Sequence, residues 1–217
     1  MVLDKKYIFF DLDGTLTDPS LGITNSIMYA LDKMGREIPP REKLYCFIGP
    51  PLIPSFREFL GMTKEEAETA LKFYRVYFGE KGIFENEPYE GIADALSEIK
   101  RSGKTVVLAT SKPEEFARKI LFHFDLAKYF DCICGSTMDE KRTEKADVIS
   151  YALETANADA SDSVMIGDRM HDIIGAQKNC MDTIGVLWGF GTKAELENAG
   201  AGRIVKTIRD MTEIIVK

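Results

Sequence analysis

Short apolar runs alternate with amphipathic segments along most of this 217-residue chain. A run of four to eight apolar residues between turn residues is typical of a buried strand, whereas apolar residues three and four positions apart predict a helix. The strand runs are residues 7–10, 105–109, 131–134, 163–166 and 183–187, and the helical patterns are residues 92–101, 114–124, 146–155 and 173–179. Because strands and helices alternate, the pattern predicts an α/β fold with a Rossmann-like parallel sheet.

The connection between the first two strand runs, residues 11–104, is much longer than the roughly dozen residues that a parallel crossover needs. Its apolar residues recur at helical spacing in two stretches, and Thr63 and Glu66 form a capping-box pattern before the second. The stretches contain Ile23, Ile27, Leu31 and Met34, and Ala67, Ala70, Leu71, Tyr74 and Phe78. We therefore expect a helical cap domain, residues 19–85, inserted into a core formed by residues 1–18 and 86–217.

The charge and composition of the chain exclude several classes of function. A formal net charge of −7 opposes binding to the phosphates of a nucleic acid polymer. No apolar run reaches the roughly 18 residues of a membrane span, and the charged residues 1–6 lack the pattern of a signal peptide. The four cysteines lack the paired spacing of a zinc site, so we expect reduced thiols that mostly fill the core. These features predict a cytoplasmic protein that acts away from membranes and nucleic acid polymers, and we expect a monomer or weak homodimer.

Two carboxylates follow the first strand run directly. Asp11 and Asp13 come immediately after residues 8–10, and Gly14 follows them. Burying an unpaired carboxylate is costly, so two of them at a strand end require a cation, a proton or an open site. This pair therefore points to chemistry rather than to packing.

Polar residues also follow two later strand runs. Thr110, Ser111 and Lys112 follow residues 105–109, and Gly167 and Asp168 follow residues 163–166, with Asp172 four positions further on. Ligands of open parallel sheets gather at the carboxyl ends of the strands. We therefore expect one site built from these strand ends.

The segment Asp11-Leu12-Asp13-Gly14-Thr15, followed by Thr110, an intervening lysine, and Gly167-Asp168 with Asp172, resembles the motifs of the haloacid dehalogenase (HAD) superfamily of phosphotransferases, in their order. Within the superfamily the chain looks like the phosphoglycolate phosphatase and 5′-nucleotidase-like branch, whose helical cap follows the first motif. The resemblance implies the HAD fold and a phosphoric monoester hydrolase.

The resemblance implies a division of labour between the first two acids. Asp11 would attack phosphorus and form an aspartyl-phosphate, and the Asp13 side chain would act as general acid and base. A carboxylate that attacks a dianionic phosphate is repelled by it, which calls for Mg²⁺ as cofactor. The implied metal ligands are Asp11, the backbone carbonyl of Asp13, and Asp168.

The phosphate group would be bound by groups from two strand ends. Thr110 would donate its hydroxyl, and Gly14 permits a tight turn that brings the backbone amides of Leu12, Asp13 and Gly14 to the same oxygens. Ser111, with Lys112, is expected to open a helix whose free N–H groups favour an anion.

A cation should orient the nucleophile, and we expect Lys145, at the start of the pattern 146–155, to supply it. Lys141 and Arg142 are the alternatives, because the preceding segment lacks the proline-containing spacing common in the family. Asp172 is expected to hold a metal-bound water or to fix the lysine.

The identity of the substrate depends on the predicted cap. Gly49 and Pro50 occupy the place of a specificity loop, and Arg57 is a candidate contact for a substrate anion. The leading substrate classes are nucleoside 5′-monophosphates and phosphoglycolate. A sugar phosphomutase of the β-phosphoglucomutase kind is an alternative that shares every catalytic residue, and a phospho-accepting signalling module resembling a response-regulator receiver is a more distant one.

Overall fold

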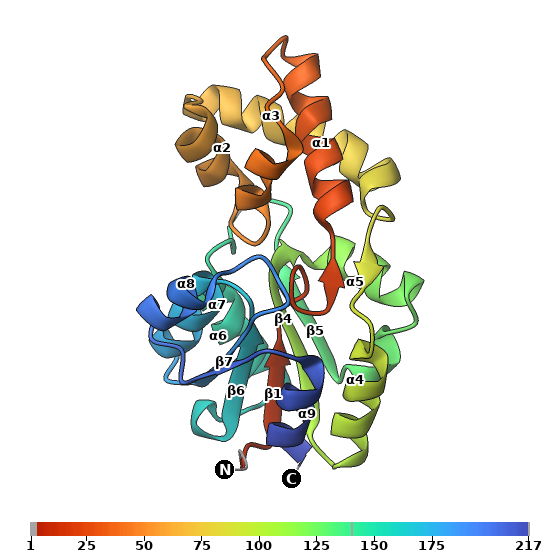
Figure 1. Ribbon diagram of the computed structural model, residues 1–217, viewed down its shortest axis with the longest axis vertical. Coiled ribbons are helices and arrows are strands. Elements are labelled where there is room, and N and C mark those ends of the chain that lie inside the picture. Colours follow the sequence, from red (N-terminus) through yellow and green to blue (C-terminus); the bar gives the residue numbers. More distant parts are fainter. Residues whose placement is uncertain (1–3, 140, 217) are drawn as a thin grey trace. The chain divides into compact units, whose positions relative to one another are not determined.

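The chain divides into two compact units in the computed structural model, which describes residues 4–139 and 141–216. The first unit comprises Met1–Thr17 and Pro88–Lys217, and the second comprises Asp18–Glu87 (Figure 1). The predicted core residues 1–3, 140 and 217, which include part of the charged N-terminal segment, lie outside the described residues. The two connections between the units are the short strands β2 (Thr17–Asp18) and β3 (Glu87–Pro88), which pair with each other.

The first unit is built on a six-stranded parallel sheet in the order β5-β4-β1-β6-β7-β8. Its strands are β1 (Tyr7–Phe10), β4 (Thr105–Pro113), β5 (Cys132–Ser136), β6 (Ser163–Gly167), β7 (Asp182–Val186) and β8 (Arg203–Val205). Strand β1 lies between β4 and β6, with Tyr7 in register with Thr105 and Ser163. The carboxyl ends of these three strands are therefore neighbours, and the predicted α/β fold with a parallel sheet is confirmed.

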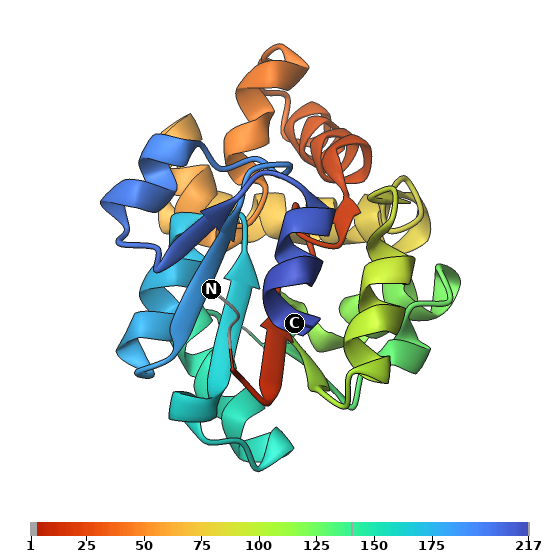
Figure 2. The same cartoon turned by 60° about the horizontal axis from the view of Figure 1, so that its bottom comes forward.

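Helices pack against both faces of this sheet. They are α4 (Ile92–Arg101), α5 (Glu114–His123), α6 (Lys145–Ala156), α7 (Met170–Lys178), α8 (Lys193–Asn198) and α9 (Ile208–Val216), with short 3₁₀ turns η3 (Ala127–Tyr129) and η4 (Ala160–Asp162). Phe9 and Met165 pack with Val148 of α6 in one buried cluster, while α4 and α9 lie side by side (Figure 2). None of the helices in the described part of the chain has the length and apolar character to cross a membrane.

The region after Thr110 differs from the prediction. Strand β4 continues through Ser111 and Lys112 to Pro113, and α5 begins only at Glu114, so the expectation that Ser111 and Lys112 open a helix is wrong. The physical reason is Pro113, because its ring disfavours helical backbone at the preceding residue. The backbone therefore stays extended through Pro113, and the helix begins at the next residue.

The cysteine prediction also needs correction. All four cysteines are free thiols, but only Cys134 is buried and Cys180 is exposed, so the expectation that most of them fill the core is wrong. Cys180 lies in the turn after α7, with a positive φ of 58°, and such turns between a helix and a strand lie at the surface.

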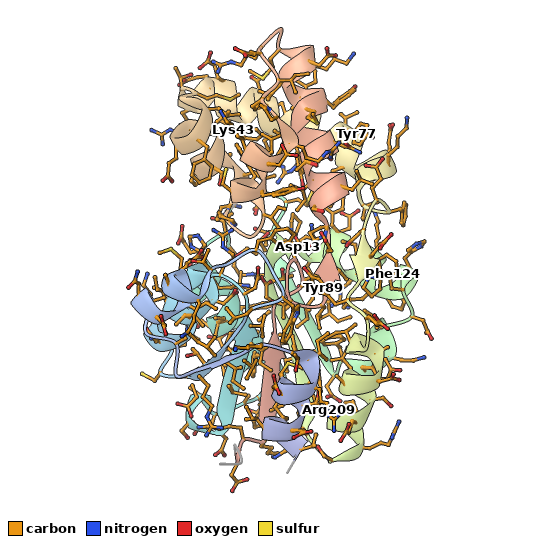
Figure 3. The ribbon with its side chains drawn as sticks, in the orientation of Figure 1. Asp13, Lys43, Tyr77, Tyr89, Phe124 and Arg209 are labelled. Carbon is orange, nitrogen blue, oxygen red and sulfur yellow. The ribbon has the colours of Figure 1, made fainter. Side chains whose placement is uncertain are left out.

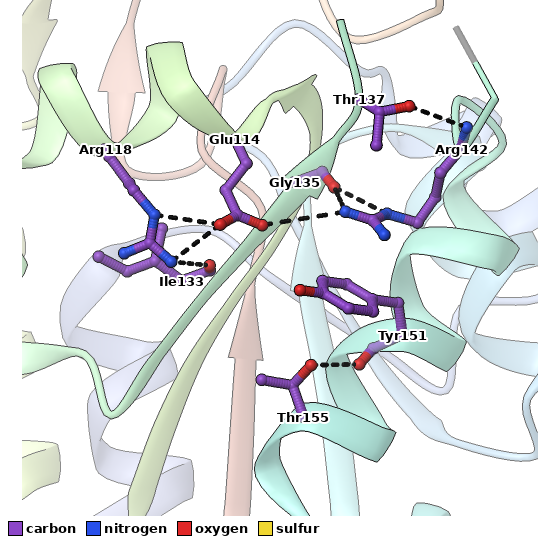
Figure 4. A network of polar contacts seen from close by, with 8 residues as sticks. All are labelled: Glu114, Arg118, Ile133, Gly135, Thr137, Arg142, Tyr151 and Thr155. Atoms are coloured by element: carbon purple, nitrogen blue, oxygen red, sulfur yellow. Dashed lines mark hydrogen bonds and ion pairs between the residues drawn. The ribbon is translucent and has the colours of Figure 1, made fainter. Parts of the chain in front are cut away.

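Strand β5 forms one edge of the sheet, and two arginines cover its backbone (Figure 4). Arg118 Nη2 donates to the carbonyl of Ile133 at 2.9 Å, and Arg142 donates to that of Gly135 at 2.9 Å from Nη2. Glu114 pairs with both guanidinium groups, at 2.9 and 3.9 Å. The edge therefore offers fewer free acceptors to a strand from another chain.

The second unit is helical. It contains α1 (Ser20–Lys33), η1 (Arg41–Phe47), α2 (Leu52–Leu60), α3 (Lys64–Tyr77) and η2 (Phe78–Gly82). The capping box predicted from Thr63 and Glu66 is confirmed, since Thr63 Oγ1 accepts from the Glu66 N–H at 3.2 Å and Glu66 Oε2 accepts from the Thr63 N–H at 2.8 Å. The predicted apolar faces of α1 and α3 pack against each other, and nearly all of their residues are buried.

Candidate active site

The turn after β1 carries two acids, Asp11 and Asp13, and Figure 3 shows Asp13 at this end of the sheet. The N–H of Asp11 donates to the carbonyl of Ile166 at 2.9 Å, which ties the strand end to β6. The chain then turns tightly, because the Gly14 N–H donates to the Thr17 carbonyl at 2.8 Å. Asp11 and Asp13 are only 3% and 8% exposed.

Gly14 cannot be replaced without disturbing this turn. Its φ of +81° is unfavourable for any residue with a side chain, and a Cβ atom would lie 2.3 Å from Asp168 Oδ2. The missing side chain therefore allows the turn that carries Asp13 to approach the carboxylate of Asp168.

Three buried acids converge at this edge of the sheet. Asp11, Asp168 and Asp172 each place a carboxylate oxygen within 4.8 Å of the other two. Burial raises the pKa of Asp168 well above its usual range, and the charge of Asp172 raises it further. Burial also raises the pKa of Asp172, to about 6, against the opposing effect of Lys145. Burial thus disfavours the charged forms of these acids, and a further positive charge beside them would stabilise their ionised forms.

The donor set fits a hard divalent cation. Asp11, Asp168 and Asp172 supply buried carboxylate oxygens that lie within 4.8 Å of one another. Closely spaced carboxylate oxygens are the ligands that Mg²⁺ prefers in proteins. The cluster contains Asp172 in place of an Asp13 carboxylate, and the expected role of the Asp13 carbonyl as a metal ligand stays a prediction.

Lys145 is the ammonium of this cluster. It is the first residue of α6, and its Nζ lies 2.8 Å from Asp11 Oδ1 and 2.7 Å from Asp172 Oδ1, while it donates a hydrogen bond to the Ala109 carbonyl at 3.0 Å. Burial alone would lower the pKa of Lys145, but Asp11 and Asp172 outweigh it and raise the pKa. The ammonium is therefore charged at neutral pH.

The two alternatives to Lys145 lie elsewhere. Lys141 pairs with Asp139 at 2.9 Å on the surface, where the lysine side chain is 83% exposed. Arg142 covers the edge strand and lies over the ring of Tyr151 at 3.6 Å (Figure 4). Of these three cations, only Lys145 contacts Asp11 among the ion pairs of the described residues.

Asp13 has its own cation, a partner that the sequence analysis missed. Lys112 Nζ lies 2.8 Å from Asp13 Oδ2, and both side chains are largely buried. Burial raises the pKa of Asp13 despite this lysine, and Asp13 Oδ1 has no hydrogen-bond partner within the described residues. The position of Lys112, two residues after Thr110, was the available clue, but its pairing depends on how β4 extends beside β1.

The predicted phosphate-binding residues lie around the same acids. Thr110 is 1% exposed, at the level where β4 pairs with the end of β5, and its hydroxyl accepts from the Lys112 N–H at 3.3 Å. Ser111 is half-buried in the extended stretch that follows. The peptide groups of Leu12, Asp13 and Gly14 form the turn after β1. The phosphate contacts of these five residues stay a prediction.

The predicted substrate residues belong to the second unit. Gly49 and Pro50 are half-buried in the loop between η1 and α2, and Arg57 is exposed on α2. The acid cluster belongs to the first unit, so the role of these three residues also stays a prediction.

Residues 188–191, after β7, contact the site and were absent from the sequence-based prediction. Trp188 Nε1 donates to the Thr15 carbonyl at 3.0 Å, and the Phe190 N–H donates to Asp168 Oδ2 at 2.8 Å. The aromatic and glycine alternation Trp188-Gly189-Phe190-Gly191 was visible in the sequence, but nothing in it showed which loops it would meet.

Comparisons with known proteins agree with this geometry. The family model for haloacid dehalogenase-like hydrolases matches residues 8–186. A 5′-nucleotidase of Pseudomonas aeruginosa is 43% identical over 87% of this chain and 86% of its own length. The tyrosine-protein kinase PtkA of Mycobacterium tuberculosis is 38% identical over 85% of this chain, which spans 62% of that kinase. A crystal structure described as a predicted phosphatase from Clostridium acetobutylicum superposes with a TM-score of 0.94 and 48% identity, covering 96% of this chain and 97% of the other.

Proposed function

Because the chain belongs to the haloacid dehalogenase-like hydrolase family, we propose that it is a magnesium-dependent phosphomonoesterase that acts on a small phosphorylated metabolite through an aspartyl-phosphate. The family resemblance and the phosphatase class expected from the sequence are confirmed by the comparisons. The observation that carries the finer proposal is the buried cluster of Asp11, Asp168 and Asp172, in which Lys145 pairs with Asp11 and Asp172. Three acids with one cation form a site that is stable when a divalent cation completes it.

The first chemical step is an attack by Asp11. One carboxylate oxygen forms a bond to phosphorus while the bond from phosphorus to the ester oxygen breaks. Lys145 orients the Asp11 carboxylate through its ion pair with Oδ1, and the ion pair with Asp172 orients Lys145 in turn. When bound, Mg²⁺ held by Asp11, Asp168 and the Asp13 carbonyl would reduce the repulsion between the carboxylate and the phosphate. Thr110 and the amides of the turn at Leu12, Asp13 and Gly14 would donate to the phosphoryl oxygens.

Asp13 moves the protons in both steps. Burial raises the pKa of Asp13, which is the direction that suits a group that gives its proton to the departing alkoxide. The carboxylate that remains is balanced by the Lys112 ammonium at 2.8 Å. Asp13 then takes a proton from the water that attacks phosphorus, the bond to Asp11 breaks, and inorganic phosphate leaves.

The substrate class is proposed from the relatives and the second unit. A 5′-nucleotidase is among the most similar relatives, which favours nucleoside 5′-monophosphates, with phosphoglycolate as the next candidate. The second unit would act as a cap that excludes water and selects the substrate through Gly49, Pro50 and Arg57.

A phosphate-release assay tests the proposal. The purified chain is incubated with MgCl₂ and a panel of nucleoside 5′-monophosphates, phosphoglycolate, sugar phosphates and phosphotyrosine peptides, and inorganic phosphate is measured. We expect release with at least one class, loss of release with EDTA or in Asp11→Asn, and normal release in the exposed control Asp210→Asn. If the wild-type chain and Asp11→Asn are equally inert across the panel, the enzyme proposal fails. A sugar phosphomutase would instead convert one sugar phosphate isomer into another.

A further inference from the structure

The segment of residues 188–191, here named the clasp, contacts two loops that come from different strands. Trp188 Nε1 donates to the Thr15 carbonyl at 3.0 Å, in the turn after β1. The N–H of Phe190 donates to Asp168 Oδ2 at 2.8 Å, in the loop after β6. The clasp therefore connects the turn that carries Asp13 with the loop that carries Asp168.

The two glycines of the clasp allow this close approach. A Cβ atom on Gly189 would lie 2.3 Å from the Gly14 carbonyl oxygen and 2.5 Å from Asp168 Cβ. One on Gly191 would lie 1.8 Å from the Asp168 carbonyl oxygen. No side chain fits at either position, so the clasp backbone packs directly against both loops.

Thr15 contacts both the clasp and Asp168. Its N–H donates to the Leu12 carbonyl at 3.2 Å, its carbonyl accepts from Trp188, and its hydroxyl donates to Asp168 Oδ1 at 3.4 Å. All three polar groups of Thr15 are thus engaged, and Asp168 is held through both carboxylate oxygens. Groups that orient a metal ligand in this way raise the affinity of the site for its ion.

We propose that the clasp is a positioning element that sets the geometry between the Asp13 turn and Asp168, and that the Trp188 indole N–H is the group through which it acts. The proposal rests on the proposed function in one respect, namely that this geometry serves a divalent cation. The indole N–H contacts the Thr15 carbonyl and acts through the turn that Thr15 belongs to, so Trp188 is a positioning residue. Its loss should weaken Mg²⁺ binding rather than the chemical step.

An isosteric replacement isolates the indole N–H. Trp188 is the only tryptophan of the chain, so growth of a tryptophan auxotroph with β-(3-benzothienyl)alanine places sulfur where the N–H stood and keeps the ring shape. We expect the MgCl₂ concentration for half-maximal activity to rise about tenfold, with kcat at saturating MgCl₂ within about twofold of wild type. A ring that merely fills space would leave the MgCl₂ requirement unchanged, and that result would overturn the proposal.

The fluorescence of Trp188 supplies a measurement that needs no turnover. Because the emission comes from this single indole, we expect a saturable change when MgCl₂ alone is added to the wild-type chain, and none in Asp168→Asn. The change should also be lost in Gly189→Ala but kept in the matched variant Gly202→Ala, where the added Cβ would lie 3.2 Å from its nearest neighbour. If the addition of MgCl₂ leaves the emission of the wild-type chain unchanged, the result contradicts the proposal.

The two proposals fail in different ways. If MgCl₂ changes the Trp188 emission but no phosphomonoester is hydrolysed, the proposal for the clasp is supported and the proposed function is wrong. If hydrolysis depends on MgCl₂, but MgCl₂ leaves the Trp188 emission unchanged and the isosteric protein has the MgCl₂ requirement of the wild-type chain, the proposal for the clasp is wrong and the proposed function is supported.

Discussion

Two polar networks lie on the same sheet, and they differ in the balance between acids and cations. At the edge strand β5, Arg118 and Arg142 share one acid, Glu114, and the side chains of this network are 24% to 46% exposed (Figure 4). At the candidate active site Lys145 faces Asp11 and Asp172, and these side chains are 1% to 5% exposed. The guanidinium groups at the edge also donate to backbone carbonyls, whereas at the site the buried Oδ1 of Asp13 has no hydrogen-bond partner within the described residues.

The difference separates a structural network from a functional one. The edge groups are paired and partly solvated, so they cost little and contribute modestly to stability. The site concentrates negative charge away from water, which raises the pKa of Asp168 and Asp172 by burial. Such an arrangement destabilises the fold unless a ligand uses it, so the imbalance of buried charge marks the site.

The largest expected effect follows from removing the proton donor. Asp13→Ala should lower kcat by about 10³-fold or more, because general acid and base catalysis is lost in both steps. Folding should persist, since the substitution removes a buried ionisable group rather than apolar packing. Steady-state kinetics and circular dichroism check this, and near-normal turnover would refute the role of Asp13.

Replacing one cation of each network by alanine tests the comparison directly. Lys145→Ala should reduce kcat by about 10²-fold or more, because Asp11 and Asp172 then repel each other without an ammonium between them. Arg142→Ala should leave kcat within about twofold, while it lowers the free energy of unfolding by about 1 kcal/mol through its lost contacts with Gly135 and Tyr151. Equal losses of activity in the two variants would contradict the assignment of Lys145.

A smaller effect is expected from pH on metal affinity. Asp172 has a pKa of about 6 and that of Asp168 is raised by burial, so both acids hold protons at low pH that Mg²⁺ must displace. The dissociation constant for Mg²⁺ should therefore fall by about tenfold or more between pH 5.5 and pH 7.5, as measured by titration calorimetry. In contrast, a constant that does not change over this range would show that these protons are not displaced.

The smallest effect concerns stability without metal. The raised pKa of Asp168 means that ionisation costs more in the folded chain than in the unfolded one, so stability falls as pH rises from the unfolded pKa through the folded pKa. In EDTA at pH 8, Asp168→Asn should therefore have a higher free energy of unfolding than the wild-type chain. Glu114→Gln at the edge should instead lower it slightly. Urea denaturation measures both, and a destabilised Asp168→Asn protein would contradict the expected strain.

The parallel sheet and the strand-end acids were predictable because their cause is local. An apolar run that ends in a carboxylate can be recognised without any partner, and the carboxyl ends of parallel strands must meet at one edge. This reasoning applies to Asp11 and Asp13, which follow β1. It applies equally to Thr110, which lies in β4, and to Asp168, which follows β6. Lys145 was predicted on similar grounds, from its place at the start of a helical pattern.

Other features depend on contacts between distant segments. Ser111 and Lys112 remain extended because β4 continues past Thr110 to Pro113, so Lys112 reaches Asp13 rather than opening a helix. Strand β8 and helices α8 and α9 were not predicted. Strand β8 and helix α8 have only three and six residues, and β8 is recognisable only by its pairing with β7, whereas α9 is as long as the predicted α7.

The sequence by itself determined the type of fold and which acids gather at its edge, because periodicity and strand ends are properties of neighbouring residues. Only the tertiary structure decided how their charges are divided, with Lys145 between Asp11 and Asp172 and Lys112 on Asp13. It also decided that residues 188–191 contact both acid-bearing loops. The physical reason is that ion pairing and close backbone approach depend on distances across strands, which no local pattern encodes.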